Sequence, residues 1–292
     1  MGFSCVCYKT DKSMIIDKQY FNDDVIINEL MHGDGLVHIK QVFPQDVIAD
    51  YRNTIQTESI DLYNSGVGNK RQRINFSRLI QLDEKIWHIV QSDYIDKVAK
   101  KWLGGGYHLG SMTSLTLMPG YITQEPHLDY PYLALRYKDR WSSMANTSFP
   151  LNLQAIVCLT EFTQENGGTL YYPGSQKKCQ YPDITFWDNC KQIISEPGDL
   201  VLYFGAMWHA GAANKTNVPR SGFFLQLLPR FITQLEDLKL SLPKEFYNNL
   251  SEYDKERLEP VTPKVVPPPC PLLDKGKTDY AVEYTGLQQF TQ

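Results

Sequence analysis

The sequence predicts a mainly β fold, a β-sandwich or jelly roll, that carries a flank of helices. Helical spacing of apolar residues dominates the chain before Gly104-Gly105-Gly106. Short apolar runs bounded by glycine or proline follow, and the turn signals Asn166-Gly167-Gly168 and Pro173-Gly174-Ser175 separate them. Helices first, and then many short strands joined by tight turns, are typical of this class of fold.

The first 15 residues are expected to form a leader, and the helical flank is expected over residues 16–106. In its longer pieces, apolar residues recur at helical spacing and therefore share one face. The glycine triplet ends the last helix. In chain order the pieces are a helix over 20–31, a short strand over 36–40, a helix over 44–55, a polar loop over 60–80 and a helix over 95–102.

The jelly-roll core is expected over residues 107–235. Apolar and polar residues alternate over 151–159, as in a strand with one buried face. Further strands are expected over 109–118, 199–204 and 222–228. Residues 236–292 are first charged with helical spacing and then rich in proline. We expect them to form a helical and Pro-rich extension that packs on the same domain.

Composition excludes several classes of protein. The net charge of −4 and the pI of about 5.9 give no general attraction to nucleic acid or to an anionic membrane. No apolar run approaches the roughly 18 residues of a membrane span, and no secretory signal is recognisable. The six cysteines lack paired metal-site spacing, which favours reduced thiols. We expect a cytoplasmic monomer or homodimer that acts on a small molecule and binds neither nucleic acid nor membrane.

The segment Gln124–Asp129 carries the first candidate ligands of a metal ion. In an extended strand, residues two apart project from the same face, so His127 and Asp129 would offer an imidazole and a carboxylate to one point. Those are two members of the 2-His-1-carboxylate triad that holds Fe(II). His209, which follows an apolar strand and a turn, is the expected third ligand. Arg220 begins the next apolar run, and its guanidinium could grip a carboxylate through two parallel hydrogen bonds.

A second His-x-Asp pattern, His32-Gly33-Asp34, is interpreted as a turn. Glycine flanks it, no strand leads into it, and no histidine–arginine pair follows at a matching separation. The pattern at His127 is therefore preferred because of its context and not because of its spacing alone.

The His127-x-Asp129 motif, the distant His209 and the following Arg220 together resemble the phytanoyl-CoA dioxygenase family, in particular its natural-product-tailoring branch. The segments 159–169 and 172–175 are similar to the family's central loop. The resemblance covers roughly residues 15–235. It implies a double-stranded β-helix, which is a cupin-like jelly roll, and an oxygenase that depends on Fe(II) and 2-oxoglutarate.

The resemblance also implies roles for individual residues. His127, Asp129 and His209 would bind Fe(II) and form the catalytic centre, with O₂ as a further co-substrate. Arg220 would pair with the distal carboxylate of 2-oxoglutarate, and two further residues, Gln124 and Thr169, would help to hold it. The implied reaction is oxidation of an unactivated C–H bond by hydroxylation, desaturation or oxidative ring closure, in secondary metabolism. This chain has Gly211 where some members have serine.

Residues directly after the iron motif are candidates for contact with the substrate. The segment 130–150 would run over the mouth of the barrel as a lid. Its candidate residues are Tyr130, Tyr132, Arg136 and Arg140. If the arginines meet an anionic group, the substrate is acidic and derived from an amino acid. The alternative is an ordinary surface loop with solvated arginines.

Two other functions are compatible with the same scaffold. One is a jelly-roll binding protein that keeps a metal without turnover, which loss of a triad residue or of Arg220 would favour. The other is a non-redox metalloenzyme, such as a zinc hydrolase or lyase, which would need no guanidinium beyond the second histidine. The chain retains all four residues.

Overall fold

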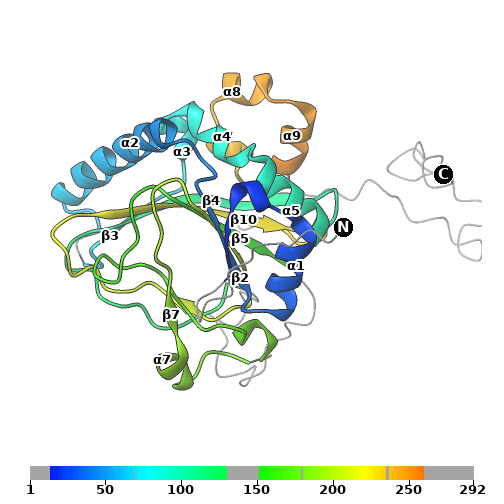
Figure 1. The fold of residues 1–292 in the computed structure, drawn as a ribbon. Coiled ribbons are helices and arrows are strands. Elements are labelled where there is room, and N and C mark those ends of the chain that lie inside the picture. The colour runs from blue at the N-terminus through cyan, green and yellow to red at the C-terminus, as the bar shows by residue number, and fades with distance from the viewer. Residues whose placement is uncertain (1–13, 69, 130–150, 179, 235–236, 260–292) are drawn as a thin grey trace, which may run out of the picture. The chain divides into compact units, whose positions relative to one another are not determined.

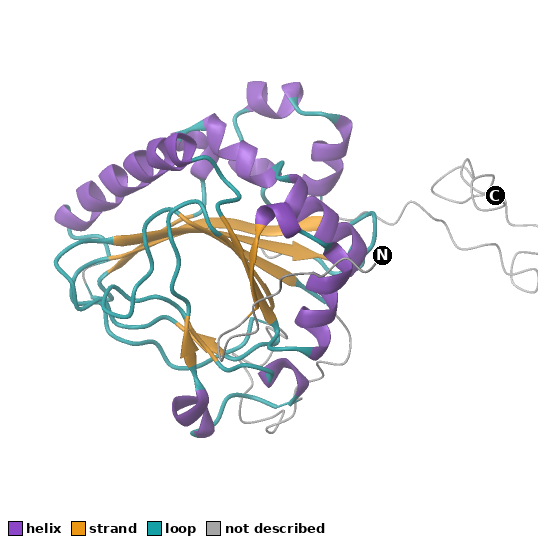
Figure 2. Ribbon diagram, in the orientation of Figure 1, coloured by secondary structure: helices purple, strands orange, loops and turns teal. Residues whose placement is uncertain are grey.

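The structure is a computed structural model that describes residues 14–68, 70–129, 151–178, 180–234 and 237–259. Over these ranges it consists of two sheets with helices around the larger one (Figures 1 and 2). The mainly β fold with a helical flank is confirmed. In the described part of the chain, no helix is long and apolar enough to cross a membrane.

The larger sheet has seven strands in the order β1-β2-β8-β5-β10-β4-β3. All its neighbouring strands pair antiparallel except β1 and β2, which are parallel. Its strands are β1 (Met14–Asp17), β2 (Leu36–Lys40), β3 (Arg73–Phe76), β4 (His108–Leu117), β5 (Leu153–Cys158), β8 (Leu200–Phe204) and β10 (Arg220–Leu228). The smaller sheet has the order β7-β6-β9, formed by β6 (Leu170–Tyr171), β7 (Lys191–Gln192) and β9 (His209–Ala210).

The helices lie mainly in the N-terminal part of the chain. They are α1 (Asp23–His32), α2 (Gln45–Asn64), α3 (Leu79–Leu82), α4 (Trp87–Val90), α5 (Asp93–Leu103), α7 (Thr185–Asn189), α8 (Lys244–Asn249) and α9 (Glu252–Leu258), with 3-10 turns at Lys18–Tyr20, Glu84–Ile86, Ser175–Lys177 and Lys239–Ser241. Local chemistry sets their ends. The Asn22 side chain accepts a hydrogen bond from the Val25 N–H at the start of α1, and Gly104 ends α5 at φ 94°.

The two faces of the larger sheet have different neighbours. On β5, Leu153, Ala155 and Val157 belong to the main hydrophobic core together with residues of the helices. The alternate residues of the same strand point the other way, toward the smaller sheet. Figure 1 shows α2 along one side of the large sheet, and β7 with α7 on the opposite side. The functional residues described below lie on this second face.

Some boundaries differ from the sequence-based expectations. The segment 60–80 was expected to be a polar loop, but α2 continues to Asn64 and Arg73–Phe76 form edge strand β3. Its alternation is short and only Ile74 is buried, so the apolar signal is weak. Strand β1 takes in the end of the segment expected as a leader. Residues 237–259 contribute buried leucines to the main core, whereas the Pro-rich segment 260–292 lies outside the described residues.

Two histidine patterns are structural. His32 is the last residue of α1 and Gly33 follows as its cap, which agrees with the interpretation of His32-Gly33-Asp34 as a turn. His38 on β2 lies 2.7 Å from the Asp199 carboxylate, and both side chains are buried. Asp199 also accepts hydrogen bonds from two backbone N–H groups, so this pair fastens β2 to the start of β8.

Candidate metal centre

Backbone pairing between two distant segments assembles the centre. The N–H of His127 donates to the carbonyl of His209, and the N–H of His209 donates to the carbonyl of His127, both at 2.9 Å. The Gln124 N–H donates to the Gly211 carbonyl on one side of this bridge, and the Asp129 N–H donates to the Gly205 carbonyl on the other. The two segments therefore run antiparallel, which places the histidines side by side.

Apolar packing holds the same two segments from behind. Leu128 lies between the two candidate ligands in sequence, points away from them and is buried in a cluster with Phe186, Trp208 and Ala210. The Trp208 N–H donates to Ser175 Oγ at 2.8 Å, and the indole N–H donates to the Gln180 carbonyl at 2.9 Å. Residues 128 and 208 thus anchor the backbone, and their neighbours are free to face the cavity.

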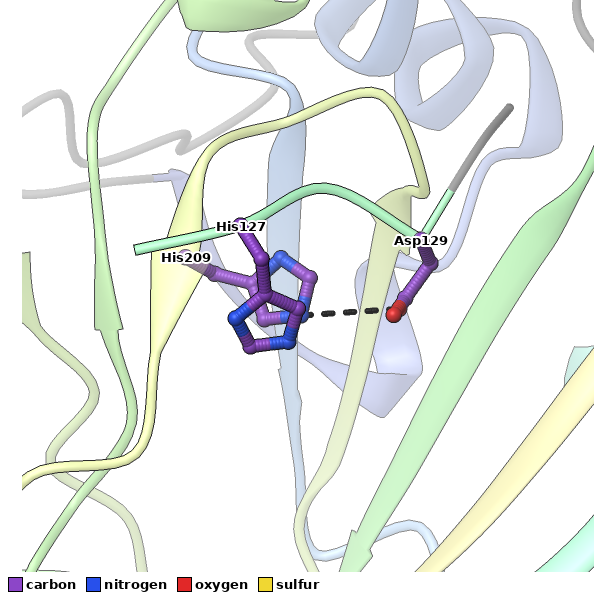
Figure 3. A group of neighbouring side chains, drawn as sticks. All are labelled: His127, Asp129 and His209. Atoms are coloured by element: carbon purple, nitrogen blue, oxygen red, sulfur yellow. Dashed lines mark ion pairs between the residues drawn. The ribbon is translucent and has the colours of Figure 1, made fainter. Parts of the chain in front are cut away.

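His127, Asp129 and His209 converge as the spacing predicted. One nitrogen or oxygen from each lies within 4.8 Å of the others. His209 Nε2 is 3.5 Å from Asp129 Oδ2, and the two imidazole rings have centroids 4.3 Å apart (Figure 3). Two imidazoles and one carboxylate on one side of a point are the donor set of the 2-His-1-carboxylate metal site.

Hydrogen bonds fix which ring nitrogens are available. The Nδ1–H of His127 donates to the Glu125 carbonyl at 3.1 Å, and the Nδ1–H of His209 donates to the Met207 carbonyl at 3.0 Å. Because a carbonyl can only accept, each Nε2 is left with its lone pair. Burial, with the nearby His209, lowers the pKa of His127 to about 4. The ring is therefore neutral at pH 7, which is the form that binds a metal ion.

The carboxylate of Asp129 is held by a neighbouring strand. The hydroxyl of Tyr203, on β8, donates to Asp129 Oδ2 at 3.2 Å. Such a hydrogen bond to a ligating carboxylate orients it and tunes its basicity. The sequence analysis did not identify Tyr203, because it stands at the end of a fully buried apolar run.

Arg220 is buried, with 1% of its surface exposed, at the start of β10. Its Nη2–H donates to the Gly167 carbonyl, and the guanidinium lies 4.2 Å above the Phe162 ring. Nε and Nη1 have no hydrogen-bond partner among the described residues. Burial lowers the pKa of Arg220 to about 10, so the group remains charged at pH 7. A buried charge with two donor nitrogens that lack partners is the arrangement expected at a binding site for an anion.

One cavity of about 310 Å³ joins the centre to Arg220. All six residues expected to bind metal or co-substrate line it: Gln124, His127, Asp129, Thr169, His209 and Arg220. There is little free space at Gly211, the position where some members of the family that the sequence resembles have serine. A Cβ added there would lie 3.1 Å from the Tyr121 hydroxyl and 3.3 Å from Gln124 Oε1, so a side chain at this position would require a small shift of these neighbours. Tyr130, Tyr132, Arg136 and Arg140 lie outside the described residues.

The cavity has further polar lining residues that the sequence analysis missed. Arg73 and Asn75 come from β3, and Gln154 and Gln226 come from the centre of the sheet. A signal existed for the glutamines, since each interrupts an otherwise apolar run. For Arg73 no signal existed, because a lone arginine in a polar segment is typical of an exposed loop.

Comparison with known proteins identifies the family. The phytanoyl-CoA dioxygenase (PhyH) model matches residues 31–222. The dioxygenase trt7 of Aspergillus terreus is 25% identical over 212 residues, which cover 69% of this chain and 72% of that protein. The multifunctional dioxygenase ausE of Emericella nidulans is 26% identical over 241 residues, which cover 75% of this chain and 77% of that protein.

Solved structures share the fold. The non-heme alpha-ketoglutarate-dependent carbocyclase SnoK from nogalamycin biosynthesis has a TM-score of 0.54 at 17% identity, over 76% of this chain and 91% of that one. HygX from Streptomyces hygroscopicus, with nickel and 2-oxoglutarate bound, has a TM-score of 0.53 at 13% identity, over 74% of this chain and 90% of that one. Because the family model matches well over half of its residues, the chain belongs to the phytanoyl-CoA dioxygenase family of enzymes.

Proposed function

We propose that this protein is an Fe(II)- and 2-oxoglutarate-dependent oxygenase that oxidises an unactivated C–H bond of a small molecule in natural-product biosynthesis. The related proteins named above include two fungal dioxygenases and an enzyme of nogalamycin biosynthesis. Hydroxylation, desaturation and oxidative ring closure are all within the reach of such an enzyme.

The observation that carries the proposal is that a three-ligand centre and a buried guanidinium, two of whose nitrogens have no partner among the described residues, line the same cavity. The donor set suits Fe(II), because it leaves coordination positions open for a chelating co-substrate and O₂. Arg220 suits the far carboxylate of that co-substrate, because its Nε and Nη1 lack partners among the described residues. The residues present therefore fit both groups.

A second guanidinium strengthens the match to an anionic ligand. Arg73 on β3 and Arg220 on β10 both pair with Leu117, which lies between them on β4. Residues directly opposite each other in antiparallel strands share a face, and both arginines line the cavity. The Arg73 guanidinium makes no hydrogen bond or ion pair with the residues that the structure describes. Two cations at one end of a cavity favour a ligand that places a carboxylate there.

The protein's own groups would divide the work as follows. His127, Asp129 and His209 would bind Fe(II), and Tyr203 would orient the carboxylate. Arg220 would hold 2-oxoglutarate by its far end, with Thr169 and Gln124 beside it, while the flanking strands exclude water. When bound, Fe(II) and 2-oxoglutarate would supply the oxidising chemistry: the keto acid would be converted into succinate and CO₂, one oxygen atom of O₂ would enter succinate, and the other would be available to oxidise the substrate.

The two alternatives make different demands on Arg220. A zinc hydrolase or lyase on this scaffold requires no buried cation opposite the metal. A binding protein that keeps a metal without turnover requires no acceptor for the two donor nitrogens that lack partners. Neither alternative explains why this charge is buried. Burial of an ion without a partner costs several kcal/mol of folding free energy.

The test is an anaerobic titration followed by exposure to air. Addition of Fe(II) and 2-oxoglutarate to the metal-free protein should give the visible charge-transfer absorption of a chelated keto acid. Admission of O₂ with a panel of small-molecule candidates should release succinate in proportion to oxidised product. Turnover that persists with Zn(II) and without 2-oxoglutarate would instead identify a non-redox enzyme.

A role in substrate binding for Tyr130, Tyr132, Arg136 and Arg140 remains a prediction. Replacement of Arg136 or Arg140 with alanine should raise the KM for an acidic substrate and leave the affinity for 2-oxoglutarate unchanged. An unchanged KM in both variants would remove the preference for an acidic substrate.

A further inference from the structure

We propose that the cavity has a second recognition site at the end of β10 opposite Arg220, where Gln154 and Gln226 bind an uncharged substrate group that both donates and accepts hydrogen bonds. A hydroxyl group and an N–H amide meet this description. The inference rests on the proposed function, because it takes the metal centre as the place of reaction. We call this pair of glutamines the carboxamide site.

Strand register brings the polar groups of this site together. Gln226 on β10 lies directly opposite Ser111 on β4 and directly opposite Gln154 on β5. Gln154 in turn lies opposite Tyr203 on β8. Opposed residues of neighbouring antiparallel strands share a face, and strands are about 4.8 Å apart. Four polar side chains therefore form one row across the sheet, and all four line the cavity.

Both carboxamide side chains are buried, and neither has a hydrogen-bond partner in the described part of the chain. Gln226 is 3% exposed and Gln154 is 7% exposed. Neither side chain makes a hydrogen bond with the residues that the structure describes, and Gln226 Oε1 is fully buried without a partner. Buried amide groups in native proteins are nearly always paired, so the unpaired oxygen of Gln226, beside a second carboxamide that bonds to no described residue, indicates groups kept for a ligand.

The backbone is adapted to this position of Gln226. The pairing of β10 with β4 changes register between Gln226 and Leu227, which leaves Gly110 as the extra residue of a bulge. A Cβ at Gly110 would collide with Gln226 Oε1 and with the Leu228 side chain. The glycine therefore provides the space in which the carboxamide lies.

The site is too far from Arg220 to serve the co-substrate. Arg220 begins the nine-residue strand β10, and Gln226 lies near its other end. At about 3.4 Å per residue the two are separated by roughly 20 Å. A short keto-diacid that is held by Arg220 and chelates the metal cannot span that distance. The ligand of the glutamines is consequently a different molecule, and the substrate is the remaining candidate.

The lining of the cavity defines the class of that substrate. Between the arginines and the glutamines the wall carries the apolar residues Leu115, Ile156 and Phe224, together with the uncharged polar residues Asn75 and Thr113. The row of Ser111, Gln226, Gln154 and Tyr203 carries no formal charge. A carboxamide offers one acceptor oxygen and one donor nitrogen, so it pairs best with a group that has both functions. The structure therefore favours a compact apolar skeleton that carries a hydroxyl or an N–H amide.

The test measures binding of matched probes to the full-length protein by ligand-observed NMR. Borneol is compared with bornyl methyl ether, and caprolactam with N-methylcaprolactam, so that each pair differs in the hydrogen-bond donor. In at least one pair, the wild-type protein should bind the probe that has the hydrogen-bond donor about tenfold more tightly than the methylated probe. The pair with the larger ratio distinguishes a hydroxyl from an amide ligand.

Three variants locate the effect. In Gln226→Leu the ratio of affinities within a probe pair should fall to about one, and in Gln154→Leu it should fall partly. In the exposed control Gln19→Leu the ratio should be unchanged. Thermal unfolding separates this role from a structural one. If Gln226 is kept for a ligand, Gln226→Leu should maintain or raise the Tm, because it removes a buried unpaired amide. A marked fall in Tm would make the glutamine a structural residue and overturn the proposal.

The outcomes also separate this inference from the proposed function. The probes bind without turnover, so the preference for a donor can be measured on metal-free protein. A preference that is lost in Gln226→Leu, in a protein that binds neither Fe(II) nor 2-oxoglutarate, would support the carboxamide site and count against the oxygenase. Normal binding of Fe(II) and 2-oxoglutarate with no preference in either pair would overturn the carboxamide site alone.

Discussion

The two ends of the cavity are built from the same strands but make opposite demands on a ligand. At one end, Arg73 and Arg220 flank Leu117, so the lining is cationic. At the other end, Gln154 and Gln226 are neutral. Both ends contain buried polar atoms that have no partner in the described part of the chain.

The difference in charge determines how strongly each end constrains the ligand. An unpaired buried ion costs several kcal/mol, whereas an unpaired buried amide costs about 1–3 kcal/mol. The arginine end should therefore constrain its ligand more strongly, to a group that carries a negative charge. The carboxamide site discriminates among substrates by a smaller free energy. A shared co-substrate at one end and a variable substrate at the other would produce this pattern.

The largest effect is expected from removal of a metal ligand, which affects both ends. Loss of a residue that hydrogen-bonds to a metal ligand typically weakens metal binding by about 10–100-fold. Asp129→Ala removes a ligand itself, so it should weaken Fe(II) binding by more than this and abolish succinate formation. Anaerobic calorimetric titration measures the affinity. Gln226→Leu serves as the control because it leaves the ligands intact. Unchanged affinity in Asp129→Ala would show that the metal binds elsewhere.

Loss of the buried cation should affect only the arginine end. Arg220→Ala should lower the affinity for 2-oxoglutarate by about 3 kcal/mol, or more than a hundredfold, because a buried charge pair loses one partner. The affinity for Fe(II) should not change. Arg220→Lys keeps the charge but loses the two-pronged geometry of the guanidinium. Its affinity for 2-oxoglutarate should lie between those of the wild-type protein and Arg220→Ala. Equal 2-oxoglutarate affinity in all three proteins would contradict the assignment.

Tyr203 donates a hydrogen bond to the Asp129 carboxylate and also belongs to the row of polar residues at the carboxamide site. Tyr203→Phe removes only the hydroxyl and should weaken Fe(II) binding by about tenfold through looser orientation of Asp129. Binding of 2-oxoglutarate, measured at saturating metal, should be unaffected. If metal affinity is unchanged but discrimination between borneol and its methyl ether falls, Tyr203 belongs functionally to the substrate end.

The smallest effect is expected at Arg73, which is half-buried. Arg73→Ala should lower the affinity for 2-oxoglutarate by about 1 kcal/mol, or roughly fivefold, because solvent screens a partly exposed pair. The exposed neighbour provides a control, Arg71→Ala, which should have no effect. A change in substrate discrimination with no change for 2-oxoglutarate would move Arg73 from one end of the cavity to the other.

The residues of the centre could be predicted from sequence because short-range signatures combine with a resemblance to a known family. His127 and Asp129 are two positions apart, and His209 and Arg220 each mark an edge of an apolar run. Their grouping in one cavity was predicted, and the structure brings them together. The jelly-roll class was also predictable, because alternation and turn residues are local properties.

The carboxamide site was not predictable in this way. Gln154 and Gln226 are far apart in sequence and become neighbours through the register of β5 with β10. Register depends on the whole set of strand pairings and on the bulge at Gly110, and neither can be read from a single run of residues. Arg73 was missed because its strand pairs on one edge only, where the apolar pattern is short.

The reciprocal amide pairing of His127 with His209 has a consequence for how the protein acquires its metal. In small zinc domains the ion drives folding, and the ligands are scattered until it arrives. Here peptide hydrogen bonds set the spacing of the two imidazoles. The metal site should therefore be preformed in the apoprotein, so that metal binding has little need to order the chain.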